Sequence, residues 1–159
     1  MKILLAALFA AIAVSPAIAQ RDVPVPAVCT AQVNQKLFDL LNAGQQRTVD
    51  NVMVCGTTVS SSRTQRGGRH GSHEILPLRA PMPDGQQKLV EVVINDDLDG
   101  VVTAPVNASV FAYGQAFFPS RGRFSAGIHD VHCSTHREAD NGWVVVNGTK
   151  SPSSCSSRY

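Results

Sequence analysis

Short runs of β-forming residues, separated by glycine, proline and Asx turns, occupy most of the chain after residue 50. Pro83-Asp84-Gly85 is a typical turn, because proline pre-sets φ and glycine accepts the left-handed conformation. Regularly spaced strands without helical repeats between them indicate a small closed barrel or a sandwich. We therefore predict a mostly β fold, a small OB-like barrel of five to six strands, with a β-sandwich as the alternative. The expected strands are 51–60, 73–78, 88–94, 109–118, 124–132 and 143–146.

One N-terminal α-helix is expected before the first strand. Thr30 is placed to cap it, since a threonine hydroxyl accepts a hydrogen bond from an unpaired backbone N–H. Apolar residues then follow at helical spacing until Gly44, at Val33, Leu37, Leu40 and Leu41. Residues 20–28 are proline-rich and predict an extended lead-in. Residues 61–71, rich in Ser, Arg and Gly, predict a loop.

Residues 1–19 have the layout of a secretory signal peptide. Lys2 supplies a charged start, an apolar run follows over 3–14, and Ala17-Ile18-Ala19 is a cleavage site of small residues. The apolar run is shorter than the roughly 20 residues that span a bilayer. We expect the mature chain to begin at Gln20, to be periplasmic or secreted, and to have no membrane span. An uncleaved anchor is the alternative.

The rest of the chain predicts one β-barrel domain over 29–150 and a Ser-rich tail over 151–159. The formal net charge is +2, and the leader takes the charge of Lys2 with it. A nearly neutral chain has little of the charge that drives binding to a phosphate backbone, so nucleic acid is not an expected partner. Two basic stretches are interpreted as solvated loops. They comprise Arg63, Arg66, Arg69 and Arg79, and then Arg121 and Arg123.

All four cysteines follow the leader, and an even number in an exported chain indicates two disulfides. Three pairings are possible. We favour Cys29–Cys55 and Cys133–Cys155, because each would tie a terminal segment to a nearby strand. Each bond is worth about 3 kcal/mol in the chain-entropy model. A zinc site that uses cysteine is the alternative, although the chain has no Cys-x-x-Cys pair.

The five histidines fall in two groups, and imidazole is the commonest metal ligand. On a regular strand, His129 and His132 would project to opposite faces, so sharing one ion requires the strand to bend or end between them. If a metal is bound, zinc is the expected cofactor. Histidines that form local hydrogen bonds on a wet barrel rim are the alternative. The candidate metal ligands are His70, His73, His129 and His132.

Catalytic signals are few. The candidate general bases are His136 and Glu74, and there is no Gly-x-Ser-x-Gly motif. Cys133 adjoins His132, but in an exported chain we expect it to be a disulfide partner. Acidic residues at 96–99 suit a hard cation, yet Val106 stands where an EF-hand needs glutamate. We therefore expect a turn built from Asx side chains there.

The run Gly127-Ile128-His129-Asp130-Val131-His132, followed by Gly142-Trp143 and Asn147-Gly148, resembles the C-terminal signature of a family of small exported bacterial proteins. These are the proteins with a domain of unknown function of the DUF-3465 type. Arg69-His70 and Asn95-Asp96-Asp97-Leu98 resemble their upstream motifs, so the resemblance runs from Gly67 to about Lys150. It implies an exported, compact, OB-like β domain with no established activity.

The positions that match this family include candidate ligand-binding residues. The residue type alone favours Trp143 as a core residue or a plug for the end of the barrel. The chain departs from the family at Ile94, where relatives tend to have histidine. The candidate ligand-binding residues are Arg69, Asn95, Asp97 and Trp143.

Three functions fit these observations. The first is an exported binding module whose histidine-rich surface site, which a metal ion would complete, grips an unknown ligand or envelope component. The second is a metal-dependent hydrolase of the phosphodiester type, with His70, His129 and His132 on the ion. The third is an inhibitor or interaction protein of the cell envelope. The sequence leaves open whether the protein is an enzyme, since one barrel hosts many functions.

Overall fold

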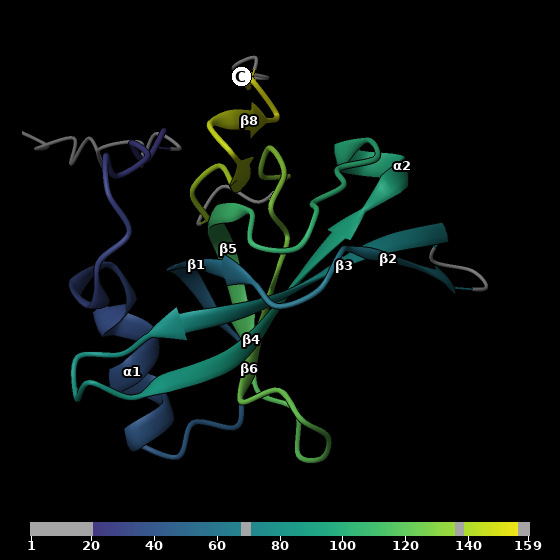
Figure 1. Cartoon of the computed structure of the whole chain (residues 1–159). Coiled ribbons are helices and arrows are strands. Elements are labelled where there is room, and N and C mark those ends of the chain that lie inside the picture. Colours follow the sequence, from purple (N-terminus) through teal and green to yellow (C-terminus); the bar gives the residue numbers. More distant parts are fainter. Residues whose placement is uncertain (1–20, 68–70, 136–138, 156–159) are drawn as a thin grey trace, which may run out of the picture.

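A computed structural model describes residues 21–67, 71–135 and 139–155 (Figure 1). A 3₁₀ turn leads into the first helix, and a second, very short helix separates the fourth and fifth strands. The elements are η1 (Ala31–Asn34), α1 (Gln35–Asn42), β1 (Val49–Thr58), β2 (Arg63–Gly67), β3 (Gly71–Pro81), β4 (Gln87–Asn95), α2 (Asp96–Asp99), β5 (Ser109–Phe117), β6 (Ala126–His129), β7 (Trp143–Val146) and β8 (Thr149–Ser151).

Five of the strands form a closed barrel. Their order is β1-β3-β4-β6-β5, and pairing of β1 with β5 closes the ring. The β4–β6 pair is parallel, whereas the other pairs of the ring are antiparallel. Strands β2, β7 and β8 extend the sheet outside the ring, through β3 and β5. The predicted OB-like barrel with one N-terminal helix is confirmed, and the sandwich alternative is wrong.

Alternate residues of the ring strands fill the barrel. Residues 90, 92 and 94 of β4 are fully buried, while their neighbours at 91 and 93 face outward. Full burial of each Val, Leu or Ile side chain contributes about 1.5–3 kcal/mol. The largest interior residues are Leu76, Leu78, Ile94, Ile128, Val52, Val54, Val90, Val92 and Val110.

A second buried cluster lies outside the ring, over β1, β5 and β7. Trp143 is its largest member and stacks on Tyr113, with ring centroids 5.9 Å apart. The lead-in covers this cluster with Val23 and Val25, and the Trp143 Nε1–H donates to the carbonyl of Val23. The lead-in is therefore a packed cover for the outer face of the sheet, although its proline-rich sequence has no periodicity.

Asn34 joins the helical segment to the barrel. This side chain is fully buried, and its amide nitrogen donates to the carbonyls of Cys55 and Pro81, at 3.1 and 2.8 Å. Its amide oxygen accepts the N–H of Cys55 at 2.7 Å. Thr30 makes no capping bond through its side chain, contrary to expectation, since the chain enters the helix through the 3₁₀ turn.

The structure corrects several element boundaries. Residues 63–67 form β2, which pairs with β3, where a loop was expected. This strand is almost entirely exposed, so it lacks the apolar alternation that marks a half-buried strand. The strand expected at 124–132 covers only 126–129. Strand β8 crosses the boundary expected between the domain and its Ser-rich tail.

Both predicted disulfides, Cys29–Cys55 and Cys133–Cys155, are present. The first fastens the lead-in to β1, and the second ties the tail to the segment after β6. The zinc–cysteine alternative is therefore wrong. Among the residues that the structure describes, every helix is too short and too polar to traverse a bilayer.

Candidate functional site

The chain turns sharply where β6 ends, and this turn holds two of the five histidines. Asp130 adopts a left-handed backbone conformation with φ of 53°. Non-glycine residues rarely do so, and such positions cluster at functional sites. The turn can pack closely against the neighbouring backbone because two glycines, Gly114 and Gly142, border it. A Cβ on Gly114 would collide with the carbonyl oxygen of His129, and one on Gly142 with that of Asp130.

Two imidazoles converge on one carboxylate at this turn. The Nδ1 atom of His129 lies 3.1 Å from Oδ1 of Asp130, and Nε2 of His132 lies 3.8 Å from the same oxygen. The Nδ1–H of His132 donates to the carbonyl of Cys133 at 2.9 Å, so that the outer nitrogen faces Asp130. On a regular strand, residues three apart project to opposite faces. The left-handed turn at Asp130 instead brings His129 and His132 to the same carboxylate.

The pKa values of Asp130 and His132 are shifted in opposite directions. Pairing with Asp130 raises the pKa of His132 to about 9, and the carboxylate of Asp99 contributes in the same direction. The hydrogen bond from His129 and the pairing with His132 hold the pKa of Asp130 well below its usual range. The pair is therefore imidazolium and carboxylate at neutral pH. Such perturbed groups beside a cavity mark a candidate functional site.

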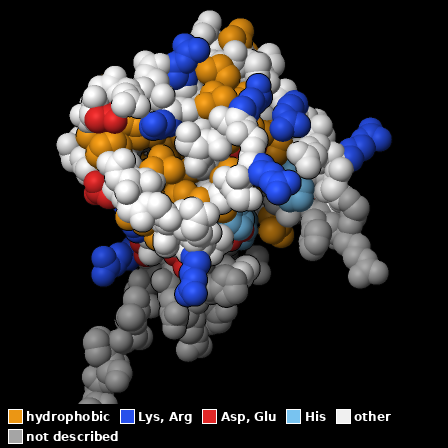
Figure 2. Space-filling model, turned by 90° about the horizontal axis from the view of Figure 1, so that it is seen from below, with side chains coloured by type: hydrophobic (Ala, Val, Ile, Leu, Met, Phe, Trp, Pro, Cys, Tyr) orange, Lys and Arg blue, Asp and Glu red, His pale blue; other side chains and the backbone are white. Residues whose placement is uncertain are grey.

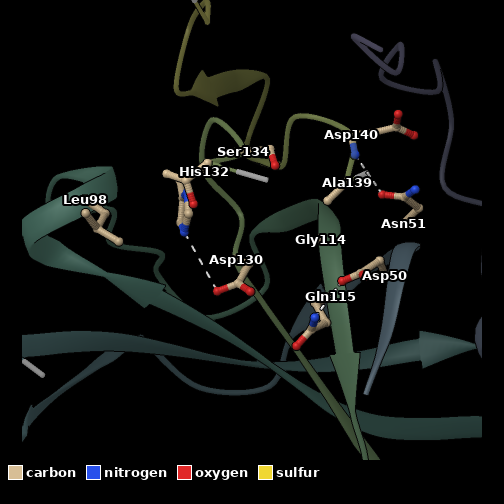
Figure 3. Close-up of a pocket in the computed structure, with 11 residues that line it drawn as sticks. Asp50, Asn51, Leu98, Gly114, Gln115, Asp130, His132, Ser134, Ala139 and Asp140 are labelled. Atoms are coloured by element: carbon tan, nitrogen blue, oxygen red, sulfur yellow. Dashed lines mark hydrogen bonds and ion pairs between the residues drawn. The ribbon is translucent and has the colours of Figure 1, made fainter. Parts of the chain in front are cut away.

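A cavity of about 680 Å³ opens beside this pair, as Figure 3 shows. Asp130 and His132 form one wall, and Asp50 and Gln115 lie at the ends of two paired ring strands. Across the cavity, the N–H of Asp140 donates to the side chain of Asn51. The remaining lining residues are Leu98, Gly114, Ser134, Thr135 and Ala139.

An acidic turn, α2, lies near the cavity. The Oδ2 atom of Asp99 accepts the N–H of Asn95, while its Oδ1 atom is buried without a hydrogen-bond partner among the described residues. Burial raises the pKa of Asp99. The side chain of Asn95 accepts the N–H of Asp97, which is the expected Asx turn. The carboxylate of Asp97 fills the space that a Cβ on Gly71 in β3 would occupy.

The structure separates some of the predicted site residues. His73 pairs with Gln65 and Asn95 across the sheet, and its electrostatic neighbour is Asp96. Glu74 is buried and accepts a hydrogen bond from the hydroxyl of Thr64. Trp143 is 2 % exposed and belongs to the outer cluster, as its core interpretation predicts. Arg69, His70 and His136 lie outside the described residues.

The predicted metal site finds no support in the part of the chain that the structure describes. Over 21–67, 71–135 and 139–155, no three His, Cys, Asp or Glu side chains are grouped so that they could hold an ion. Instead, the nitrogen atoms of His129 and His132 that face Asp130 pair with its carboxylate.

Sequence reasoning missed Asp50, Gln115 and Asp140 as parts of the site. They lie on β1, on β5 and just before β7, and only closure of the ring brings these segments together. Gly114 interrupts an apolar strand, and an isolated glycine in a strand indicates a close backbone approach. This glycine was the one local signal for the β5 part of the site.

Comparison with known protein families, with curated proteins and with solved structures gives no match. The resemblance to the DUF-3465 type therefore stays a prediction, and the geometry alone carries the functional argument.

Proposed function

We propose that this protein is an exported binding module that holds a small polar ligand in the cavity beside Asp130 and His132. The ion pair between these two residues carries the proposal. A pair that is already charged offers fixed hydrogen-bonding groups to a ligand and needs no proton transfer to do so.

The same pair argues against base catalysis at this site. A general base works best when its pKa lies near the operating pH. His132, with a pKa of about 9, is protonated at neutral pH, and Asp130 is a weak base because its pKa is depressed. A metal ion would also require deprotonated imidazoles.

The charges of the cavity favour a ligand that donates hydrogen bonds. Asp50, Asp130 and Asp140 supply three carboxylates, and His132 balances one of them. Some of their acceptor capacity is used, because Asp140 accepts the hydroxyl of Tyr113 at 2.8 Å and Asp50 accepts the amide of Gln115. The excess of carboxylates suits a cationic or polyhydroxylated ligand and disfavours an anion.

Two observations support export. The disulfides suit an oxidising compartment, and residues 1–19 have the layout of a signal peptide. We propose a periplasmic or secreted location, with maturation before Gln20. Mass spectrometry of the secreted or periplasmic protein is expected to find an N-terminus at Gln20, and an intact Met1 would contradict this.

The other two hypotheses rest on fewer contacts. A phosphodiester hydrolase with zinc would need His70 on the ion, and His70 lies outside the described residues. Of its two candidate general bases, His136 also lies outside them, and Glu74 is buried and bonded to Thr64. An envelope inhibitor would need a protein-sized contact surface. Neither has a geometric observation comparable to the Asp130–His132 pair.

The test titrates ¹⁵N-labelled protein with three sugars of similar size: glucosamine, glucose and glucuronate. Glucosamine is expected to shift the amide signals of Gln115, His132 and Ser134 most, and glucuronate least. Asp50→Asn is expected to weaken the glucosamine response several-fold. Asp84→Asn, an equal change of charge on the exposed β3–β4 turn, is the control. Equal responses to glucuronate and glucosamine, or none to any sugar, would contradict the proposal.

A further inference from the structure

Folding brings Arg63 and Arg123, one arginine from each basic stretch of the chain, to one face of the barrel. Arg63 lies on β2, and Arg123 lies in the connection between β5 and β6. Burial raises the pKa of Glu91 on β4, and the positive charges of Arg63 and Arg123 oppose that rise. Both guanidinium groups therefore lie near one carboxylate, although 60 positions separate them in the sequence.

The register of the sheet defines this face. Glu91 is opposite Pro77 on β3 and opposite Gly127 on β6. It points outward, because Val90 and Val92 on either side are fully buried in the barrel. Arg79 follows Pro77 by two residues, so it shares the outward face and is exposed.

Aromatic rings lie among these charges. Phe117 is opposite Gly127, and its ring fills the space that a Cβ on that glycine would occupy, next to the position of Glu91. The ring also meets the imidazole of His129 edge-on, with centroids 5.3 Å apart. The guanidinium of Arg123 lies 4.8 Å from the ring centroid of Phe124. We name this surface the arginine face; it comprises Arg63, Arg79, Glu91, Phe117, Arg123 and Phe124.

The positive charge of the arginine face is largely unneutralised. Within the described residues, none of its guanidinium groups forms a hydrogen bond or a close ion pair with a carboxylate. Figure 2 views the barrel from below, where the β5–β6 connection of Figure 1 lies. Basic and hydrophobic side chains are interspersed over the centre and right of this view. Acidic side chains lie toward the left and lower margins, where further basic side chains also lie.

We propose that the arginine face binds single-stranded nucleic acid. Proteins that bind single strands combine a positively charged surface for the phosphates with aromatic rings on which bases stack. The arginine face supplies both elements, and arginine adds cation–π contacts of the kind seen between Arg123 and Phe124. The site is separate from the cavity beside Asp130, which is rich in carboxylates and would repel phosphate.

This inference revises the expectation from net charge. A nearly neutral chain binds phosphates poorly only if its charges are evenly mixed. Here the acidic residues Asp50, Asp130 and Asp140 line the cavity, while Glu91 is the one acidic residue of the arginine face. An unpaired strand also exposes its bases for stacking, whereas a duplex hides them.

The test measures fluorescence anisotropy of a labelled 12-nucleotide oligothymidine with the purified protein over a series of salt concentrations. Arg63→Gln/Arg123→Gln is expected to weaken binding at least tenfold at low salt. Two lost phosphate contacts should reduce the slope of log K against log salt by about 1.4. Arg21→Gln/Arg47→Gln removes the same charge from exposed positions outside the arginine face, and is expected to change affinity less than twofold.

A second comparison separates stacking from charge. Phe124→Leu is expected to weaken oligothymidine binding about fivefold or more and to leave heparin, a polyanion without bases, unaffected. Circular dichroism and urea unfolding check that each variant folds. Absence of binding, equal losses in the two double variants, or equal affinity for heparin and oligothymidine would overturn the proposal. Asp50→Asn, which is expected to weaken the glucosamine response of the cavity, should leave oligothymidine binding intact, so the two tests are independent.

Discussion

His132 and Asp130 form an ion pair across a left-handed turn, with 3.8 Å between Nε2 and Oδ1. The carboxylate also accepts a hydrogen bond from His129, so a single side chain orders both imidazoles at the end of β6. This arrangement leads to two predictions about protonation, and the surrounding backbone leads to a third.

Asp130→Asn should lower the pKa of His132 from about 9 toward its ordinary value of 6.5, because the main stabilising charge is removed. Asparagine tolerates the left-handed conformation, so the backbone should persist. Titration of the imidazole Cε1–H signal by NMR measures the shift. Asp84→Asn, far along the chain on an exposed turn, should leave the pKa unchanged. A His132 pKa that stays near 9 in Asp130→Asn would show that Asp130 is not the cause.

Stability should fall as the pH rises from about 6.5 through about 9. The pKa of His132 is higher in the folded state than its ordinary value of 6.5, so its contribution is complete below 6.5 and is lost as the imidazolium deprotonates. Asp130 acts oppositely, since its depressed pKa makes a contribution that is present above 3.8 and lost in acid. Urea midpoints across this range measure the effect. His132→Gln should flatten the alkaline part of the curve, and an unchanged slope in that variant would contradict the assignment.

Gly114→Ala should destabilise the fold by about 3 kcal/mol or more, because the new methyl group would collide with the backbone carbonyl of His129. The carbonyl directly precedes Asp130, whose φ is 53°. Gly44→Ala is the comparison: Gly44 has a positive φ of 65° but open space around it. It should cost about 1 kcal/mol. Urea denaturation measures both, and equal costs would mean that the turn is not tightly held.

Asn34→Ala should cost about 2–4 kcal/mol, since it removes three hydrogen bonds and leaves buried backbone groups of Cys55 and Pro81 unpaired. Asn42→Ala lies in the same helical segment but is exposed, and it should change stability by less than about 0.5 kcal/mol. Thermal and urea unfolding of the pair provide the measurement. A similar small cost for both would contradict the role of Asn34 in fixing the helix to the barrel.

The barrel could be predicted because its strands are marked by turns and by β-branched residues at alternating positions, as in 88–94. Both disulfides could also be predicted, since each joins a terminal segment to a nearby strand. Strand β2 could not, because exposed arginines and glutamines carry no burial signal. The site could be predicted only in part. The sequence identifies His129 and His132 as candidates, but they lie close together only because Asp130 adopts a left-handed conformation. The arginine face could not be predicted, because only the folded chain brings Arg63 and Arg123 near the same carboxylate, that of Glu91.

The parallel seam between β4 and β6 and the antiparallel seam between β1 and β5 both join segments that are distant along the chain. Any fragment that stops before Ala126 would expose the unpaired edges of β4 and β5, which are templates for aggregation. The ring therefore closes only once β6 has been made. The export that we propose would benefit from this late closure, because no piece of the chain that stops before Ala126 could fold into a complete barrel and obstruct translocation.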